Sequence, residues 1–274
     1  MIGFNKLIRK VKKFIKVILK KFNFGAVSYS NLIRLQNFEH QIDQNLNSKI
    51  SLEFIKTLPN KHTNLLVPLL NESHSDLHQD LFALSESNFK RNGFFVEFGA
   101  ASGLSGSNTY LLEKEFSWKG ILAEPARDRH RELHKNRPNA FVEEKCVYKT
   151  SGSLMEFSEI PETGISTLTK FIESDEHAVL RKNSNKYMVE TISLNDLLLK
   201  YNAPTYIDYL SIDTEGSEFE ILSSFDFSKY EIKVITCEHN NTHNRGKIYT
   251  LLVEYGYKRK YENCSHYDDW FVKT

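Results

Sequence analysis

The sequence FFVEFGAASG at residues 94–103 constrains the fold more than any other stretch of this chain. An apolar run that contains Glu97 leads into a loop of small residues, and a helical pattern follows over residues 107–116. A strand, a tight glycine loop and a helix in this order bring a backbone close to a nucleotide-like ligand. This stretch therefore predicts an α/β protein whose ligand lies at the end of the strand.

Strand and helix patterns alternate from residue 93 onwards. We expect strands at 94–98, 120–124, 140–147, 188–192, 206–213, 233–238, 255–261 and 269–273, and helices at 107–116, 127–136, 194–201, 217–224 and 246–254. Such alternation predicts a largely parallel sheet with helices on both faces. Because only a short segment joins the last two strands, they should form an antiparallel hairpin.

The chain divides by composition into three predicted parts. Residues 1–24 hold eight basic side chains and no acid, so subtracting eight from the net charge of +1 leaves −7 for residues 25–274. Residues 25–92 are polar, rich in Asn and mostly helical in pattern, and predict a helical N-terminal extension. Residues 93–274 are expected to form the α/β domain.

The basic segment, residues 1–24, has the pattern of an amphipathic helix. Its lysines and Arg9 fill most of the face opposite its apolar residues, which are Phe4, Leu7, Ile8, Val11, Phe14, Ile15, Ile18, Leu19 and Phe22. Such a helix lies in a membrane interface beside anionic lipids, although a helix docked on protein is the alternative. Its longest uninterrupted apolar run, residues 17–19, is too short for a signal peptide or a spanning helix, so we expect neither secretion nor a membrane crossing.

These features predict the location and the partners of the chain. We expect a cytoplasmic protein that is peripheral on the inner face of the membrane, with residues 1–24 on its anionic surface. The acidic body and the lack of interleaved aromatic and basic residues argue against nucleic acid as a partner. The apolar faces of residues 25–92 favour a homodimer.

The three cysteines, Cys146, Cys237 and Cys264, are far apart in the sequence. An odd number without a CxxC pair argues against a disulfide framework or a zinc site. Each lies in or near an apolar stretch, so we expect buried free thiols in a reducing cytosol.

The glycine loop differs from the common nucleotide motifs. Its pattern, Glu97-x-Gly99-x-x-x-Gly103, is neither GxGxxG nor a phosphate loop that ends in GK[ST]. An acid at the strand end suits a ligand with hydroxyls or an ammonium group better than one with phosphates. Glu124, at the end of the next predicted strand, can accept hydrogen bonds from both hydroxyls of a ribose. This combination fits S-adenosylmethionine.

At this point the chain resembles the FkbM family of class I methyltransferases. The similarity covers roughly residues 93–273 and rests on segments 95–100, 107–113, 118–125, 164–168, 210–222 and 269–273. The resemblance implies a Rossmann-like class I methyltransferase fold with a mostly parallel seven-stranded sheet whose last strand is antiparallel. It also implies S-adenosylmethionine-dependent O-methylation, often of sugar or polyketide hydroxyls.

The resemblance assigns the cofactor site by position. Glu97, Gly99 and Gly103 would line the methionine end of the cofactor, Glu124 would hold the ribose, and Cys146 and Val147 would lie near the adenine. Cys146 could equally be a core thiol. The complete set of predicted cofactor-binding residues is Glu97, Gly99, Ala100, Gly103, Asn108, Glu124, Cys146, Val147 and Asp213.

Two polar clusters at strand ends supply the predicted chemistry. Asp213 and Glu215 end one central strand, and Glu238, His239 and Asn240 end the next. In one mechanism, Asp213, Glu238 and Asn240 hold Mg²⁺, which lowers the pKa of the acceptor hydroxyl. In the other, His239 or a carboxylate is the general base. The predicted catalytic residues are Asp213, Glu215 and His239, and the alternative for Asp213 is a helix cap.

The sequence thus predicts O-methylation of a hydroxyl, most simply on a sugar of a surface glycan or of a lipid-linked saccharide. This substrate rests on the basic helix and on family analogy. A non-catalytic saccharide- or partner-binding module is the alternative. A nicotinamide-dependent oxidoreductase is a further alternative, and the missing GxGxxG counts against it.

Overall fold

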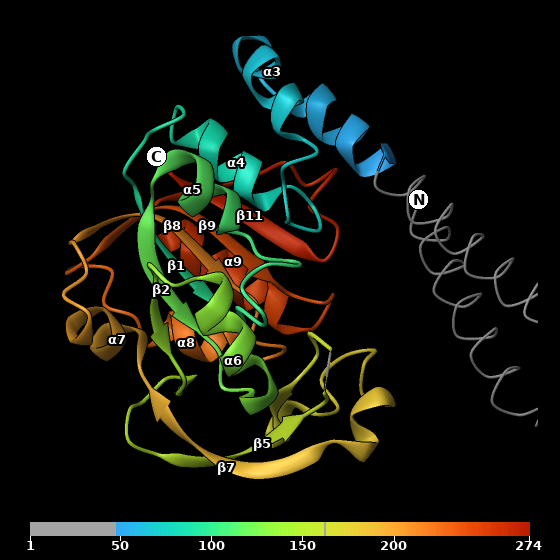
Figure 1. The fold of residues 1–274 in the computed structure, drawn as a ribbon, viewed down its shortest axis with the longest axis vertical. Helices are drawn as coiled ribbons and strands as arrows, with labels where there is room; N and C mark the ends of the chain where they lie inside the picture. Colours follow the sequence, from blue (N-terminus) through green and yellow to red (C-terminus); the bar gives the residue numbers. More distant parts are fainter. Residues whose placement is uncertain (1–47, 162) are drawn as a thin grey trace, which may run out of the picture. The chain divides into compact units, whose positions relative to one another are not determined.

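The computed structural model describes residues 48–161 and 163–274. Residues 50–274 form one compact unit, shown in Figure 1. The predicted basic helix at residues 1–24 and residues 25–47 of the predicted extension lie outside the described residues. The boundaries of the three predicted parts therefore remain predictions.

A seven-stranded sheet forms the centre of this unit, in the order β10-β11-β9-β8-β1-β2-β3. β11 is antiparallel to both of its neighbours, and the other neighbouring pairs are parallel. This topology confirms the predicted fold class. The strands are β1 (Phe94–Phe98), β2 (Lys119–Ala123), β3 (Phe141–Glu143), β8 (Tyr206–Ile212), β9 (Glu231–Glu238), β10 (Tyr257–Lys260) and β11 (Asp268–Lys273).

Four further strands form a second sheet, in the order β4-β7-β5-β6. They are β4 (Cys146–Val147), β5 (Leu154–Glu159), β6 (Thr167–Leu168) and β7 (Asn185–Ile192). The single strand expected at 140–147 was wrong: the side chain of Glu143 accepts the N–H of Lys145 at 3.2 Å, a bond that competes with the ladder and ends β3. The strand expected at 188–192 exists as part of β7, but it belongs to this second sheet. β5 was not predicted.

Helices lie on both faces of the main sheet (Figure 1). The α-helices after β1 lie close to their predicted positions, and each buries leucine or isoleucine side chains. α7 begins where predicted because Ser193 caps it by accepting the N–H of Asp196 at 3.1 Å. Residues 48–57 are helical, and the α-helices that follow are α3 (Asn60–Leu66), α4 (Gln79–Glu86), α5 (Tyr110–Phe116), α6 (Arg127–Asn136), α7 (Leu194–Lys200), α8 (Glu218–Ser223) and α9 (Asn244–Glu254).

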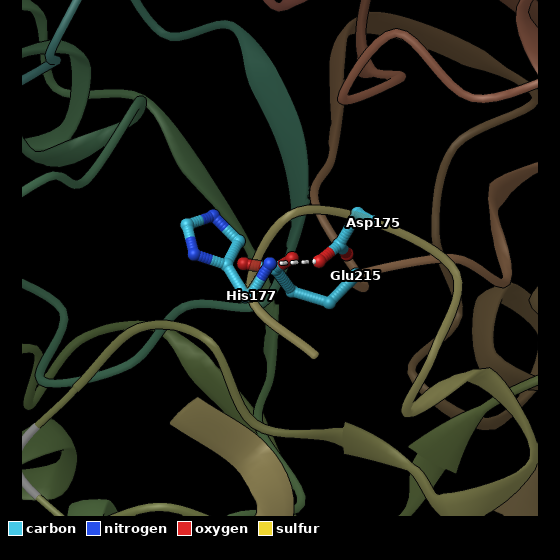
Figure 2. Close-up of side chains that lie close together, drawn as sticks. All are labelled: Asp175, His177 and Glu215. Atoms are coloured by element: carbon cyan, nitrogen blue, oxygen red, sulfur yellow. Dashed lines mark hydrogen bonds between the residues drawn. The ribbon is translucent and has the colours of Figure 1, made fainter. Parts of the chain in front are cut away.

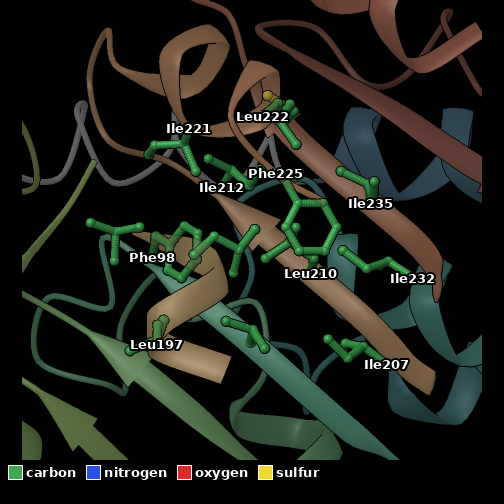
Figure 3. Packing of buried hydrophobic residues seen from close by; sticks show 14 of the residues in the cluster. Phe98, Leu197, Ile207, Leu210, Ile212, Ile221, Leu222, Phe225, Ile232 and Ile235 are labelled. Carbon is green, nitrogen blue, oxygen red and sulfur yellow. The ribbon is translucent and has the colours of Figure 1, made fainter. Parts of the chain in front are cut away.

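The largest buried cluster joins one face of the sheet to α7, α8 and α9. Figure 3 shows side chains of β1, β8 and β9 packed with those of α7 and α8. Because side chains alternate along a strand, Phe271 belongs to this cluster whereas its neighbour Trp270 does not. Trp270 instead stacks on Phe82 of α4 at 4.8 Å and contacts Phe54, which places residues 50–86 in the same compact unit as the sheet.

Two further expectations concern the whole described part of the chain. The three cysteines are buried and free, as predicted. Within residues 48–161 and 163–274, none of the helices has the length and apolar character needed to traverse a bilayer.

Candidate functional site

Polar residues from four parallel strands meet at one edge of the main sheet. The last residue of β1 pairs with the last residues of both β2 and β8, so the residues that follow these strands lie together. Those residues are Gly99, Glu124 and Asp213, and Glu238 ends the adjacent strand β9. β1 lies between β2 and β8, and ligands of open α/β sheets bind where the strand order reverses in this way.

Gly99 lets the chain pass very close to the end of β8. Its φ is +72°, and a Cβ atom there would lie 1.9 Å from the backbone oxygen of Asp213. Its N–H donates to the carbonyl of Ala123 at 3.0 Å. Only glycine fits this position, because any side chain would force β1 and β8 apart.

Glu97 binds protein groups. Its carboxylate accepts hydrogen bonds from the Ser107 hydroxyl at 3.0 Å, the Asn108 N–H at 2.7 Å and the Thr109 hydroxyl. The buried guanidinium of Arg137 lies 3.7 Å away. Glu97 therefore orders the segment before α5, and its predicted place at the methionine end of the cofactor does not fit this geometry.

A cavity that is partly open to solvent lies beside the ends of β1 and β2. Of the predicted cofactor residues, the cavity is lined by Gly99, Glu124, Cys146, Val147 and Asp213. Four others do not line it, namely Glu97, Ala100, Gly103 and Asn108. The remaining lining residues are Phe98, Ala101, Ala123, Pro125, Ala126, Arg129, Phe157, Thr163, Gly164, Ser166, Leu168, Thr214 and Ser217.

Glu124 supplies a buried carboxylate to this cavity. One oxygen accepts the N–H of Ala126 at 2.7 Å, and the other accepts the N–H of Ala101 at 2.8 Å. Burial raises the pKa of Glu124 to about 7, although these two bonds oppose the rise. Each oxygen has a further lone pair, so the carboxylate can still accept bonds from a pair of ligand hydroxyls.

Cys146 forms an apolar part of the lining of this cavity. Its side chain is buried, and burial, with the neighbouring charge of Glu124, raises the pKa of the thiol to about 12. The thiol is therefore neutral and suits contact with a flat aromatic group better than nucleophilic chemistry.

Three carboxylates converge behind Gly99. Asp213, Glu215 and Glu238 each place an oxygen within 4.8 Å of the others. Burial raises the pKa of Asp213 to about 8, and burial together with the charge of Asp213 raises that of Glu238 well above its usual range. Oδ1 of Asp213 has no hydrogen-bond partner among the described residues, so an acceptor atom remains available there.

The carboxylate of Glu215 is already bound by the chain. It accepts from Arg181 at 2.6 Å and from the amide nitrogen of Asn240 at 3.1 Å. The side chain of Asn240, the third residue of the predicted metal-binding set, thus contacts the carboxylate cluster by its hydrogen bond to Glu215. Burial and Asp213 raise the pKa of Glu215, and Arg181 opposes that rise.

His239, predicted as the general base, has one ring nitrogen bound by the chain. Its Nδ1 accepts the N–H of Asn241 at 2.9 Å, and its Nε2 lies 3.7 Å from Asp269. Its side chain is buried and does not line the cavity. Burial lowers its pKa to about 4, so the ring is neutral at physiological pH.

A polar pair near Asp213, formed by Tyr267 and Asp76, was missed by sequence reasoning. The hydroxyl of Tyr267 donates to Asp76 at 3.4 Å, across 191 residues of sequence, and the Tyr267 carbonyl accepts the N–H groups of His239 and Asn240. Asp76 is exposed to solvent in its side chain, and partial desolvation of its carboxyl raises its pKa. No local pattern in the sequence marks this pair.

We expect Asp213→Asn to stabilise the ligand-free protein at pH 8. The pKa of Asp213 is about 8 in the folded state against 3.8 as its ordinary value, so between these values the folded state binds more protons. Stability from this group therefore falls as pH rises through that range. The melting temperature of the variant should exceed that of the wild type by about 3 °C or more at pH 8, and the gap should shrink towards pH 5.

The matched control for this experiment is Asp226→Asn, because hydrogen bonds from Ser228 lower the pKa of Asp226 instead of raising it. Thermal unfolding at pH 5, 6, 7 and 8 measures both variants. A melting temperature of Asp213→Asn below that of the wild type at pH 8 would contradict the burial of Asp213. A difference from the wild type that is the same at every pH would also contradict it.

Comparison with known proteins gives one family. Residues 97–259 match the family model described as the methyltransferase FkbM domain. No curated protein matches the chain at a significant level.

Among solved structures, two methyltransferases are similar at low identity. A precorrin-6y C5,15-methyltransferase from Geobacter metallireducens GS-15 is 12% identical, with 66% of this chain and 71% of that chain covered and a TM-score of 0.35. A TehB-like SAM-dependent methyltransferase from Corynebacterium glutamicum ATCC 13032 Kitasato is 8% identical, with 78% and 97% covered and a TM-score of 0.36.

Proposed function

We propose a saccharide hydroxyl as the methyl acceptor of this chain, which belongs to the FkbM family of S-adenosylmethionine-dependent methyltransferases. The acceptor would meet the methyl donor at the edge of the sheet where β1, β2, β8 and β9 end. The observation that carries the proposal is the pair of buried carboxylates Asp213 and Glu238, of which Asp213 lines the cavity.

The residues around the cavity suit the cofactor. When bound, S-adenosylmethionine supplies a methyl group on a sulfonium sulfur. Glu124 would accept hydrogen bonds from the two ribose hydroxyls, and Cys146 and Val147 would form an apolar wall for the adenine. The missing Cβ at Gly99 lets the ligand approach the backbone at the sheet edge.

Asp213 is the residue proposed to accept the proton of the acceptor hydroxyl. A hydroxyl oxygen is a weak nucleophile until its proton is leaving, so a base within hydrogen-bond reach speeds the transfer. The pKa of about 8 makes Asp213 a stronger base than an exposed carboxylate, and Oδ1 has no partner among the described residues. Glu238 beside it can share the proton that Asp213 takes up.

The polar groups near Asp213 support a polyhydroxyl acceptor. Asp76 and Tyr267 offer a carboxylate and a phenol, and Asp268 accepts a hydrogen bond from the side-chain nitrogen of Gln79 at 2.9 Å. An apolar acceptor could not exchange hydrogen bonds with these groups. Hydroxyls of a sugar can both donate to the carboxylates and accept from the phenol.

Mg²⁺ remains a prediction at this site. Asp213 and Glu238 are the residues that would hold it, and it would lower the pKa of an acceptor hydroxyl. Glu215 is less available to a metal because Arg181 and Asn240 already bind it.

The experiment that tests the proposal measures S-adenosylhomocysteine release from S-adenosylmethionine with a panel of acceptors. The panel contains neutral, acidic and amino sugars as glycosides, and matched amines without sugar hydroxyls, each with and without excess chelator. We expect release with a sugar hydroxyl acceptor and a rate that increases as pH rises through about 8, because Asp213 must be ionised. Methyl transfer to the amines alone would overturn the proposed O-methylation. A transfer rate unchanged by excess chelator would exclude a role of Mg²⁺ in the reaction.

The proposed membrane contact rests on the sequence of residues 1–24. We expect the full chain to bind vesicles that contain about 30% anionic lipid and a variant lacking residues 1–24 to stay in solution, because eight basic side chains are lost. Co-sedimentation at increasing salt measures this. A deletion variant that still sediments with the vesicles would contradict the membrane contact. Loss of vesicle binding on deletion would support a lipid-linked saccharide as the acceptor.

A further inference from the structure

One wall of the cofactor cavity comes from the excursion between β5 and β7. Within residues 163–184, the cavity is lined by Thr163, Gly164, Ser166 and Leu168. This segment has little regular structure beyond β6 and the short 3₁₀ turns η2 (Thr169–Phe171) and η3 (Leu180–Asn183). Its position against the sheet therefore depends on side-chain contacts, and we call it the cavity wall.

Arg181 makes the central one of these contacts. Its side chain is fully buried, and its guanidinium donates to both oxygens of Asp175 at 2.9 Å each and to Glu215 at 2.6 Å. A further bond runs from its Nε to the carbonyl of Ile165 at 2.8 Å, close to the residues that face the cavity. One side chain thus joins both ends of the cavity wall to the turn that carries Asp213.

Figure 2 shows the acidic side of this contact, where Asp175 and His177 of the cavity wall come together with Glu215. The three residues have a composition that could suit a metal ion. The Arg181 guanidinium, however, binds both oxygens of Asp175 and one of Glu215, so the chain supplies its own cation. A fork of N–H donors fits two carboxylates in a fixed geometry that a spherical ion or an ammonium does not reproduce.

Two smaller contacts act at the same place. The hydroxyl of Thr167 donates to the carbonyl of Glu215 at 2.9 Å. A Cβ atom at Gly216 would lie 3.0 Å from the Cβ of Phe171, so the cavity wall packs directly on the backbone of the turn. The wall is therefore docked on the turn from residue 213 to residue 217, and Arg181 provides the charged contact within it.

We propose that Arg181 is a positioning residue that holds the cavity wall against the Asp213 turn and so preserves the shape of the cofactor cavity. The inference rests on the proposed use of this cavity for S-adenosylmethionine. Arg181 touches neither cofactor nor acceptor in this arrangement. Its effect on binding comes from fixing the cavity wall on one side and the Glu215 carboxylate on the other.

The test uses Arg181→Lys and Arg181→Met in the full chain. The first keeps the charge but loses the fork, and the second leaves two buried carboxylates without their cation, so it is the more destabilising. S-adenosylhomocysteine is the probe, and calorimetry measures its Kd. We expect Kd to rise at least tenfold in Arg181→Lys, with a further rise in Arg181→Met.

Lys90→Met is the matched control. Lys90 binds the buried carboxylate of Asp208 at 2.7 Å near the start of β8, at the sheet edge opposite to the cavity. Lys90→Met also removes a cation from a buried carboxylate. The variant should therefore have a lower melting temperature but an unchanged Kd for S-adenosylhomocysteine. This control separates a loss of cavity shape from a general loss of stability.

Hydrogen exchange in the ligand-free protein gives a second readout. The amides of Ile172, Ser174 and Leu180 bond within the cavity wall, and they should exchange faster in Arg181→Lys than in the wild type or in Lys90→Met. A folded Arg181→Lys protein with wild-type Kd and wild-type exchange would overturn the proposal. If the wild type does not bind the probe, the proposed function fails, while the exchange result still decides whether Arg181 holds the wall.

Discussion

Gly99→Ala is expected to destabilise the domain severely and to abolish S-adenosylhomocysteine binding. The new Cβ would lie 1.9 Å from the backbone oxygen of Asp213, a distance at which one of the two strands must move. The positive φ of 72° adds a backbone cost of about 1 kcal/mol for a residue with a side chain. Together these effects should lower the free energy of unfolding by ~3 kcal/mol or more.

Gly152→Ala separates the two causes. Gly152 has φ of +76°, close to that of Gly99, but no atom lies within 4 Å of its ideal Cβ position. It should therefore lose only the backbone contribution and bind the probe normally. Urea unfolding gives the free energies and calorimetry gives Kd. Equal losses in the two variants would show that β1 and β8 do not approach as closely as described.

Glu124→Gln should weaken S-adenosylhomocysteine binding by roughly 10- to 100-fold, because hydrogen bonds to a charged acceptor contribute about 1.5–3 kcal/mol. The neutral amide has one acceptor oxygen where the carboxylate has two. It cannot hold both the Ala101 and Ala126 N–H groups and still accept from two ribose hydroxyls. The loop that carries Ala101 should loosen at the same time.

The wild-type affinity should also depend on pH. With a pKa of about 7, the ionised fraction of Glu124 rises from roughly one tenth at pH 6 to nine tenths at pH 8, so Kd should fall about ninefold over this range. Glu124→Gln should remove this dependence. Glu144→Gln is the control, since Glu144 is exposed, binds His134 and does not line the cavity. A wild-type Kd that is constant from pH 6 to 8 would refute the ribose role.

Much of the main sheet followed from local sequence pattern. The strands β1, β2, β8, β9 and β11 lie within a few residues of their predicted positions. They could be predicted because an apolar run bounded by turn residues is visible in a short stretch of sequence. The second sheet was missed because its strands pair residues across a long excursion, and β5 is half exposed with only a short alternating pattern. Residues 50–86 lack such alternation, and the sequence did not indicate their packing on Trp270.

The candidate site divides in the same way. Gly99, Glu124, Asp213 and Glu238 could be expected to lie together because each stands at the end of a recognisable strand, and parallel strands end at one edge. The partners of Glu97, Glu215 and His239 could not be predicted. Each is a polar residue at a strand end, but its partners come from distant segments that no pattern in the sequence announces.

The sequence by itself determined the type of fold, the edge of the sheet where the candidate site residues gather and the family, because strand period, glycine positions and strand ends are local properties. Only the tertiary structure decided which acids face the cavity and which are already bound by arginine. Arg137 reaches Glu113 and the Glu97 segment from the end of α6, and Arg181 reaches Glu215 from the cavity wall. A buried carboxylate needs a partner, and that partner is chosen by side-chain packing between segments far apart in the chain.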